Sequence, residues 1–165
     1  MRLFKRRSLA QRLAQWSQSV PQQPLCRVHI DRGGVFIVQL RPPQVAEQWA
    51  DRLLQEQRQQ VVAVLQVSPE LIHEVLVVAD GSGAITAPNM CYLSGIDEFL
   101  KTYSMPLFQA AEVKQLIQLW RRQQPRCQQC NTAMHMQIRQ HGAYAGTHYY
   151  SCANFPRCRQ LKAAN

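Results

Sequence analysis

The sequence predicts an α/β fold in which helices flank a mixed sheet, followed by a small β ribbon at the C-terminus. Three observations lead to this prediction. A β hairpin is expected over residues 26–40, helical and strand patterns alternate after it, and four cysteines close to the C-terminus form two pairs. The hydrophobic fraction of 46% in 165 residues provides for one modest core and one small module. We therefore expect three segments: 1–24, 25–120 and 125–165.

The N-terminal segment is expected to contain one amphipathic helix. Apolar residues alternate with basic and amide residues at helical spacing from Leu3 to Ser19, and Leu9, Leu13 and Trp16 share one stripe. The polar, proline-bounded stretch from Ser17 to Pro24 predicts a linker. Since no long apolar run is present, we expect neither a secretory signal nor a membrane span, but a soluble cytoplasmic protein whose thiols stay reduced.

The predicted sheet starts with the hairpin from Cys26 to Leu40. Its first strand alternates polar and apolar residues, Arg32-Gly33-Gly34 is a tight turn, and Val35 to Leu40 is rich in β-branched residues typical of a buried strand. Pro42-Pro43 ends this strand. An amphipathic helix is then expected over Val45–Gln60.

The elements after this helix are shorter. We expect strands at Val61–Val67 and Glu74–Ala79, and helices at Gly95–Tyr103 and Leu107–Trp120. Ser94 is the expected N-cap of the first of these helices. Cys26 and Cys91 lie in apolar surroundings and are expected to be buried. His29 and His73 have no Ser or Cys partner in a hydrolase-like context, so hydrogen-bonded structural roles are expected for both.

The cysteine spacing near the C-terminus predicts a metal site. Cys127 and Cys130 have two residues between them, and Cys152 and Cys158 have five. Two such pairs across a hairpin-length spacer can complete the tetrahedron that structural zinc prefers. Four sulfur ligands leave no open position, so this Zn²⁺ would fold the ribbon and perform no chemistry. Two disulfides are the alternative, as is replacement of a thiolate by His135 or His148.

Residues 127–159 resemble the C4 zinc finger found at the C-terminus of bacterial type IA DNA topoisomerases. The most specific part is Asn154-Phe155-Pro156-Arg157-Cys158, which follows the family's pattern, including its wide second cysteine pair. The chain departs from the pattern at Gln128 for Pro, Asn131 for Gly and Ser151 for Gly. Asn tolerates the left-handed conformation, so Asn131 is compatible with a metal knuckle. The resemblance implies a bacterial zinc-binding and DNA-binding module.

Charge supports a polyanionic partner for this module. The formal net charge is +9, the last acidic residue is Glu112, and all seven charged residues from Arg121 onward are basic. Aromatic residues are interleaved with them, an arrangement suited to stacking single-stranded bases. We expect Tyr149 and Phe155 in the ribbon core. The expected nucleic-acid contacts are Arg139, Tyr144, Tyr150, Arg157, Arg159 and Lys162. The alternative is that the arginines only solubilise the module.

The preceding segment also resembles the nuclease-related domain of the restriction-endonuclease-like superfamily. The resemblance covers roughly residues 26–103 and centres on Gly33 to Arg41, where the family's hydrophobic strand ends in Glu-x-Lys. Here Gln39 and Arg41 stand at those positions. A neutral amide cannot supply the anionic oxygen that Mg²⁺ requires. In another alignment, the unpaired acids would be Asp31, Glu47, Glu70 and Glu74.

Three functions follow as hypotheses. The favoured one is a zinc-dependent, non-catalytic protein that binds nucleic acid, with DNA, including single strands, as the expected partner. The second is an active metal-dependent nuclease, which leaves enzymatic activity open. The third is an interaction module within a complex that processes DNA.

Overall fold

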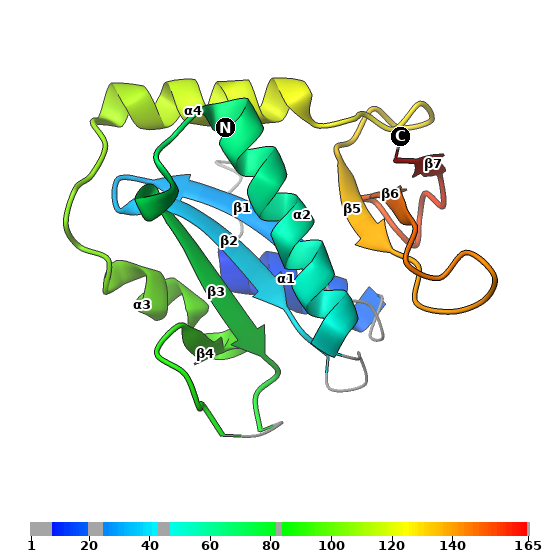
Figure 1. The fold of residues 1–165 in the computed structure, drawn as a ribbon, viewed down its shortest axis with the longest axis horizontal. Coiled ribbons are helices and arrows are strands. Elements are labelled where there is room, and N and C mark those ends of the chain that lie inside the picture. The colour runs from blue at the N-terminus through cyan, green and yellow to red at the C-terminus, as the bar shows by residue number, and fades with distance from the viewer. Residues whose placement is uncertain (1–7, 20–24, 43–46, 82–83, 165) are drawn as a thin grey trace, which may run out of the picture.

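The computed structural model describes residues 8–19, 25–42, 47–81 and 84–164. Its helices and strands, shown in Figure 1, are α1 (Leu9–Ser19), β1 (Leu25–Asp31), β2 (Gly34–Leu40), α2 (Glu47–Leu65), β3 (Ile72–Val78), β4 (Met90–Tyr92), α3 (Ile96–Lys101), α4 (Ala110–Gln123), β5 (Met134–Ile138), β6 (His148–Cys152) and β7 (Leu161–Ala163). Short 3₁₀ turns at Pro69–Leu71 and Leu93–Gly95 precede β3 and α3. The predicted α/β class with a small C-terminal β unit is confirmed.

The larger sheet has the strand order β1-β2-β3-β4 and is mixed. Strand β2 pairs antiparallel with β1 and parallel with β3, which pairs parallel with β4. Every residue of β2 is buried because helices cover both faces. In Figure 1, α2 crosses in front of the sheet and α1 lies behind it. One core cluster joins α1 and α3 to the sheet, and the other joins α2 and α4 to it.

The predicted hairpin is confirmed, and a glycine at its turn is required by packing. Gly34 has φ +143° and begins β2 opposite Asp31. A Cβ at Gly34 would lie 2.7 Å from the His73 ring. The ring of His73 in turn contacts Phe36 and Tyr103. Only glycine leaves room for this ring against the turn.

The predicted strand Val61–Val67 is wrong, because α2 continues to Leu65. Its buried positions include Leu53, Gln57, Val61 and Leu65, each four residues after the last. The Val-rich run therefore extends the apolar face of the helix against the sheet. A short apolar run does not by itself distinguish a strand from a buried helical turn. The start of the predicted helix, Val45–Ala46, lies outside the described residues.

Two smaller predictions are also corrected, and one strand was missed. Helix α1 includes Ser17, so the linker does not start at that residue. Residues 3–7 and 20–24 and the side chain of Trp16 lie outside the described part of the chain. Strand β4 was not predicted. Ser94 does not cap α3: its hydroxyl donates to Asp80 at 2.8 Å, and Gly95 is the N-cap.

The C-terminal ribbon is a separate antiparallel sheet of order β5-β6-β7 that packs on the α/β unit. Ile138 of β5 is buried with Cys26 of β1 and Leu53 of α2. At the turn between β5 and β6, Gly146 lies against the side chains of Trp49 and Arg52. The ribbon is thus held to the first strand of the sheet and to α2. Over the residues the structure covers, no helix has the length and apolarity to cross a bilayer.

Candidate metal centre

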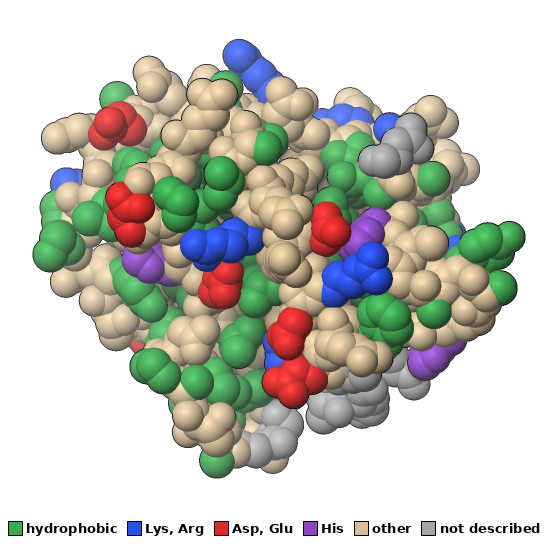
Figure 2. All heavy atoms as spheres, in the orientation of Figure 1, with side chains coloured by type: hydrophobic (Ala, Val, Ile, Leu, Met, Phe, Trp, Pro, Cys, Tyr) green, Lys and Arg blue, Asp and Glu red, His purple; other side chains and the backbone are tan. Residues whose placement is uncertain are grey.

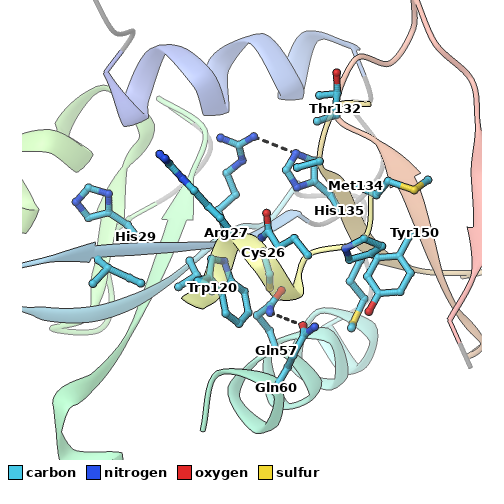
Figure 3. A pocket seen from close by; sticks show the side chains of 18 of the residues that line it. Cys26, Arg27, His29, Gln57, Gln60, Trp120, Thr132, Met134, His135 and Tyr150 are labelled. Atoms are coloured by element: carbon cyan, nitrogen blue, oxygen red, sulfur yellow. Dashed lines mark hydrogen bonds between the residues drawn. The ribbon is translucent and has the colours of Figure 1, made fainter. Parts of the chain in front are cut away.

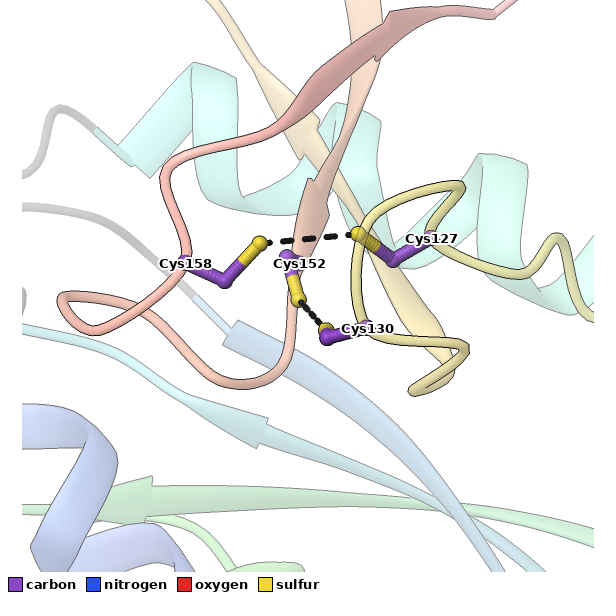
Figure 4. A group of neighbouring side chains, drawn as sticks. All are labelled: Cys127, Cys130, Cys152 and Cys158. Atoms are coloured by element: carbon purple, nitrogen blue, oxygen red, sulfur yellow. Dashed lines mark hydrogen bonds between the residues drawn. The ribbon is translucent and has the colours of Figure 1, made fainter.

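The four cysteines come from two loops that the ribbon brings together. Cys127 and Cys130 lie in the loop after α4, Cys152 is the last residue of β6, and Cys158 follows the next turn (Figure 4). Asn131 closes the first loop in the left-handed conformation, with φ +54°, and its N–H donates to the Cys127 carbonyl at 2.9 Å. The expectation that Asn replaces the family's glycine without breaking the knuckle is confirmed.

The sulfur atoms have the spacing of a tetrahedral thiolate site. All four lie within 4.8 Å of one another. Cys127 Sγ and Cys158 Sγ are 3.5 Å apart, and Cys130 Sγ and Cys152 Sγ are 3.3 Å apart. Metal–sulfur bonds of about 2.3 Å at tetrahedral angles would place the sulfurs about 3.8 Å apart. All six cysteines are free thiols, with separations in this cluster well beyond a disulfide bond. The four cysteines can hold a metal ion.

The surroundings of Cys130 and Cys152 shift the pKa values of their thiols in opposite directions. Hydrogen bonding by Thr132 lowers the pKa of Cys130 to about 6, and the Thr132 hydroxyl lies 3.4 Å from its sulfur. Burial raises the pKa of the Cys152 thiol to about 12. The Asn154 N–H donates to Cys152 Sγ at 3.4 Å. A cation would stabilise the buried thiolate that burial alone disfavours.

The cysteines also form a small core of their own. Cys127, Cys152 and Cys158 are buried together with Met134, and Tyr150 packs against them. Cys130 is exposed. Tyr150, which was expected to contact nucleic acid from an exposed position, is half-buried with its ring packed against this core. Tyr149 and Phe155, predicted to be core residues, are half-buried.

None of the histidines of the ribbon belongs to the cysteine group. Of the described residues, only Cys127, Cys130, Cys152 and Cys158 form a group of metal-ligand type. His135 instead lies against Arg27, with 2.9 Å between the His135 Nε2 and Arg27 Nη2 atoms. A closed set of four sulfurs leaves no ligand position for a substrate. The arrangement suits a structural ion.

The predicted nucleic-acid contacts lie in two groups rather than one. Arg139 follows β5 at the hairpin turn, and its guanidinium lies 6.0 Å from the ring centres of Tyr144 and Tyr149. Tyr144 is 67% exposed. Arg157 and Arg159 are exposed beyond Cys152, at the other end of the hairpin, and Lys162 is exposed on β7 opposite Tyr150. The five-residue strands separate Arg139 from Arg157 and Arg159 by about 17 Å along the chain direction.

The position matched to a nuclease carboxylate holds a buried amide. Gln39 is 0% exposed, and its amide nitrogen donates to the Ala50 carbonyl at 2.5 Å. Its side-chain oxygen accepts from Arg41 at 2.9 Å. Arg41 also donates to Asp51 and Glu47 at 2.6 and 3.3 Å. The carboxylates of Glu47 and Asp51 are thus used in ion pairs with Arg41.

The other acids considered from the sequence are dispersed. Asp31 pairs with His29 at 3.3 Å, Glu74 pairs with Arg58 at 2.9 Å, and Glu70 is exposed. In Figure 2, acidic and basic side chains lie next to one another over the face that carries α2. Apart from the cysteine cluster, the described residues contain no group of three or more metal-ligating side chains.

Cys26, Cys91 and His73 are packed into the α/β unit, away from the cysteine cluster. Cys26 and Cys91 are 3% and 7% exposed, and burial raises the pKa of their thiols to about 12 and about 11. The expectation that both are buried is confirmed. His73 differs from expectation, because its buried Nε2 makes no hydrogen bond to any described residue. Its ring is held by aromatic contacts instead.

Sequence reasoning missed a set of residues at the junction of the two sheets. Arg12, Arg27, Gln57 and His135 line a cleft between the α/β unit and the ribbon. The sequence signal was Arg27, an arginine in the middle of β1, the strand that pairs with the fully buried β2. A charged side chain at such a position needs a hydrogen-bonding or oppositely charged partner, because removing it from water is costly. The partner depends on how the ribbon docks, which no local pattern specifies.

No family model, curated protein or solved structure matches this chain. The resemblances to the topoisomerase finger and to the nuclease-related domain therefore rest on the residues alone.

Proposed function

We propose that Cys127, Cys130, Cys152 and Cys158 bind one structural Zn²⁺, and that the protein binds nucleic acid, DNA in the first place, without catalysing a reaction on it. The observation that carries the proposal is the gathering of four sulfurs within 4.8 Å at the base of a basic ribbon. Zinc fits the donor set because Zn²⁺ binds four thiolates in the tetrahedral geometry that structural zinc sites adopt. The ion supplies folding free energy and charge, and the ribbon's own side chains make the contacts.

The ribbon's surface chemistry supports a polyanionic ligand. All seven charged side chains from Arg121 onward are basic, and four thiolates on a dication leave this segment with a net positive charge. At the hairpin turn, Arg139 lies over two tyrosine rings, and the more exposed ring, Tyr144, is open to stacking. Such a cation–ring pair can hold a phosphate and a base of one strand.

The non-catalytic part of the proposal is supported by Gln39 and Arg41. A nuclease of the family that the segment resembles would need an anionic oxygen at position 39. Gln39 instead accepts a hydrogen bond from Arg41 and donates one to the Ala50 carbonyl. The rival proposals, a metal-dependent nuclease and a docking module for a DNA-processing complex, have no specific contact in the described residues that favours them.

The test uses the full zinc-loaded chain and a fluorescent single-stranded oligonucleotide. We expect anisotropy to report binding that weakens steeply with salt, because phosphate contacts release counterions. Arg139→Gln should weaken binding. It should also make the plot of log affinity against log salt concentration less steep, by the amount expected for about one phosphate contact. The matched control is Arg32→Gln, which removes the same charge at the exposed β1–β2 turn. Salt-independent affinity, or equal losses in both variants, would contradict the proposal.

A further inference from the structure

A cleft lies where the ribbon meets the α/β unit. Its volume is about 450 Å³, and its walls come from α1, β1, α2, α4 and the ribbon strands. Its charged and polar lining includes Arg12, Arg27, Arg121, His29, Gln57 and Gln60. Figure 3 shows Arg27 and His135 on one side and Gln57 and Gln60 of α2 on the other. None of its lining residues is acidic.

Arg27 is a half-buried cation in this cleft. Its Nη2 lies 2.9 Å from His135 Nε2. Because a guanidinium only donates, the histidine nitrogen accepts and the imidazole is neutral. Burial, and then the nearby charge of Arg12, lower the pKa of Arg27 to about 10, so it remains charged at neutral pH. The histidine satisfies one donor but supplies no negative charge.

The protein provides no side-chain counter-charge for this arginine. All ten Asp and Glu residues lie in the described ranges. The five ion pairs among those ranges involve Arg41, Arg58, Lys101 and His29, and none involves Arg12, Arg27 or Arg121. Burying a charge without an opposite one is costly, whereas a bound anion would offset that cost.

We propose that this cleft binds the phosphate group of a nucleotide, with Arg27 as the anchor and Arg12 and Arg121 flanking it. The volume exceeds what a phosphate alone occupies, which leaves space for an attached sugar and base. Gln57 donates to the Gln60 side-chain oxygen at 3.0 Å, which leaves the Gln60 amide nitrogen to contact that base. Guanidinium groups suit phosphate because they donate two parallel hydrogen bonds. The choice of a nucleotide rests on the proposed function, but the site is separate from the hairpin turn.

The experiment measures binding of adenosine monophosphate, adenosine and inorganic phosphate to the full zinc-loaded chain by calorimetry. Adenosine monophosphate should bind and adenosine should not. Arg27→Met should lose at least about tenfold in affinity, which follows from removing a charge-assisted bidentate contact. Arg12→Gln, at an exposed residue, should lose about threefold and serves if Arg27→Met does not fold. Arg32→Gln should bind as the wild type does.

The outcomes separate this site from the ribbon surface. Binding of adenosine, or adenosine monophosphate binding that survives both Arg27→Met and Arg12→Gln, would overturn the proposal. Comparable affinity for inorganic phosphate would confirm the anion site and assign recognition to phosphate alone. Competition by a 5′-phosphorylated but not a 5′-hydroxyl oligonucleotide would identify strand ends as the source. Arg139→Gln should leave adenosine monophosphate binding unchanged. If the wild-type chain binds adenosine monophosphate but no oligonucleotide, the proposed function fails and the cleft proposal stands.

Discussion

Arg27 Nη2 donates a hydrogen bond to His135 Nε2 at 2.9 Å, across the junction between the large sheet and the ribbon. One residue belongs to β1 and the other to β5. The contact requires a neutral imidazole, and it joins the cleft to the ribbon that carries the cysteines. Packing of Ile138 against Cys26 and Leu53 supports the same junction from its apolar side.

The first prediction concerns pH. Burial, and then the charge of Arg27, lower the pKa of His135 to about 3, against about 6.5 in an unfolded chain. Between these values the unfolded chain binds the proton and the folded chain does not. The free energy of unfolding should therefore be unaffected by this group above about pH 6.5 and fall as the pH drops, by about 2 kcal/mol at pH 5.

The variant His135→Gln isolates this effect. Glutamine keeps an acceptor for Arg27 and cannot take up a proton. Urea unfolding of the zinc-saturated wild type and variant, compared at about pH 8 and pH 5, should show the variant losing about 2 kcal/mol less. Protonation of the zinc ligands affects both proteins and cancels in the difference. Parallel pH profiles would show that His135 is not held neutral.

The second prediction concerns the cysteines. Cys152→Ser removes a buried sulfur of the cluster, whereas Cys91→Ala removes a buried thiol far from it. We expect the serine variant to lose bound zinc and the ordered ribbon, and the alanine variant to keep one zinc per chain with at most a modest loss of stability. Metal analysis and NMR signals of the ribbon amides measure this. Equal zinc content in the two variants would argue against the assigned ligands.

The third prediction concerns stacking at the hairpin turn. Tyr144 is exposed and lies beside Arg139. Removal of its ring in Tyr144→Ala should weaken single-strand binding by about 1 to 3 kcal/mol. Tyr144→Phe keeps the ring and should bind as the wild type does. If the two variants bind alike, the base does not stack here.

The fourth prediction concerns the junction. Leu53 is 0% exposed and packs with Ile138 and Cys26. Leu53→Ala should cost about 2 to 5 kcal/mol and loosen the ribbon from α2, because it leaves a cavity between them. Leu119→Ala, at a side chain that is 44% exposed on α4, should cost far less. Urea unfolding measures the cost, and hydrogen exchange of β5 amides reports the docking. Similar costs in both variants would mean that the ribbon does not depend on this contact.

The sequence predicted the parts of the fold whose signals are local. The turn at Gly33-Gly34, the alternation in β1 and the cysteine spacing each specify geometry within a few residues, and the structure agrees with them. The run from Val61 to Leu65 was misassigned because composition alone favours a strand, while packing on the sheet continues the helix. Strand β4 is only three residues long and forms because β3 offers it a partner.

The site was predictable to a similar degree. Four thiols with this spacing have few arrangements other than one cluster, so the cysteine group could be expected. The place of Tyr150 could not, because neighbouring residues of a strand face opposite sides and the inward side depends on register with β5. The arginine in the middle of β1 indicated a charge in need of a partner, but the cleft around Arg27 depends on the docking of two modules, which no local pattern specifies.

X-ray absorption spectroscopy at the zinc edge, on the protein purified without added metal, tests the proposed zinc site most directly. We expect one zinc per chain with four sulfur neighbours at about 2.3 Å and no nitrogen or oxygen neighbour. A protein with no zinc, a coordination shell that includes nitrogen or oxygen, or cysteines joined as disulfides would contradict a zinc site made of four thiolates.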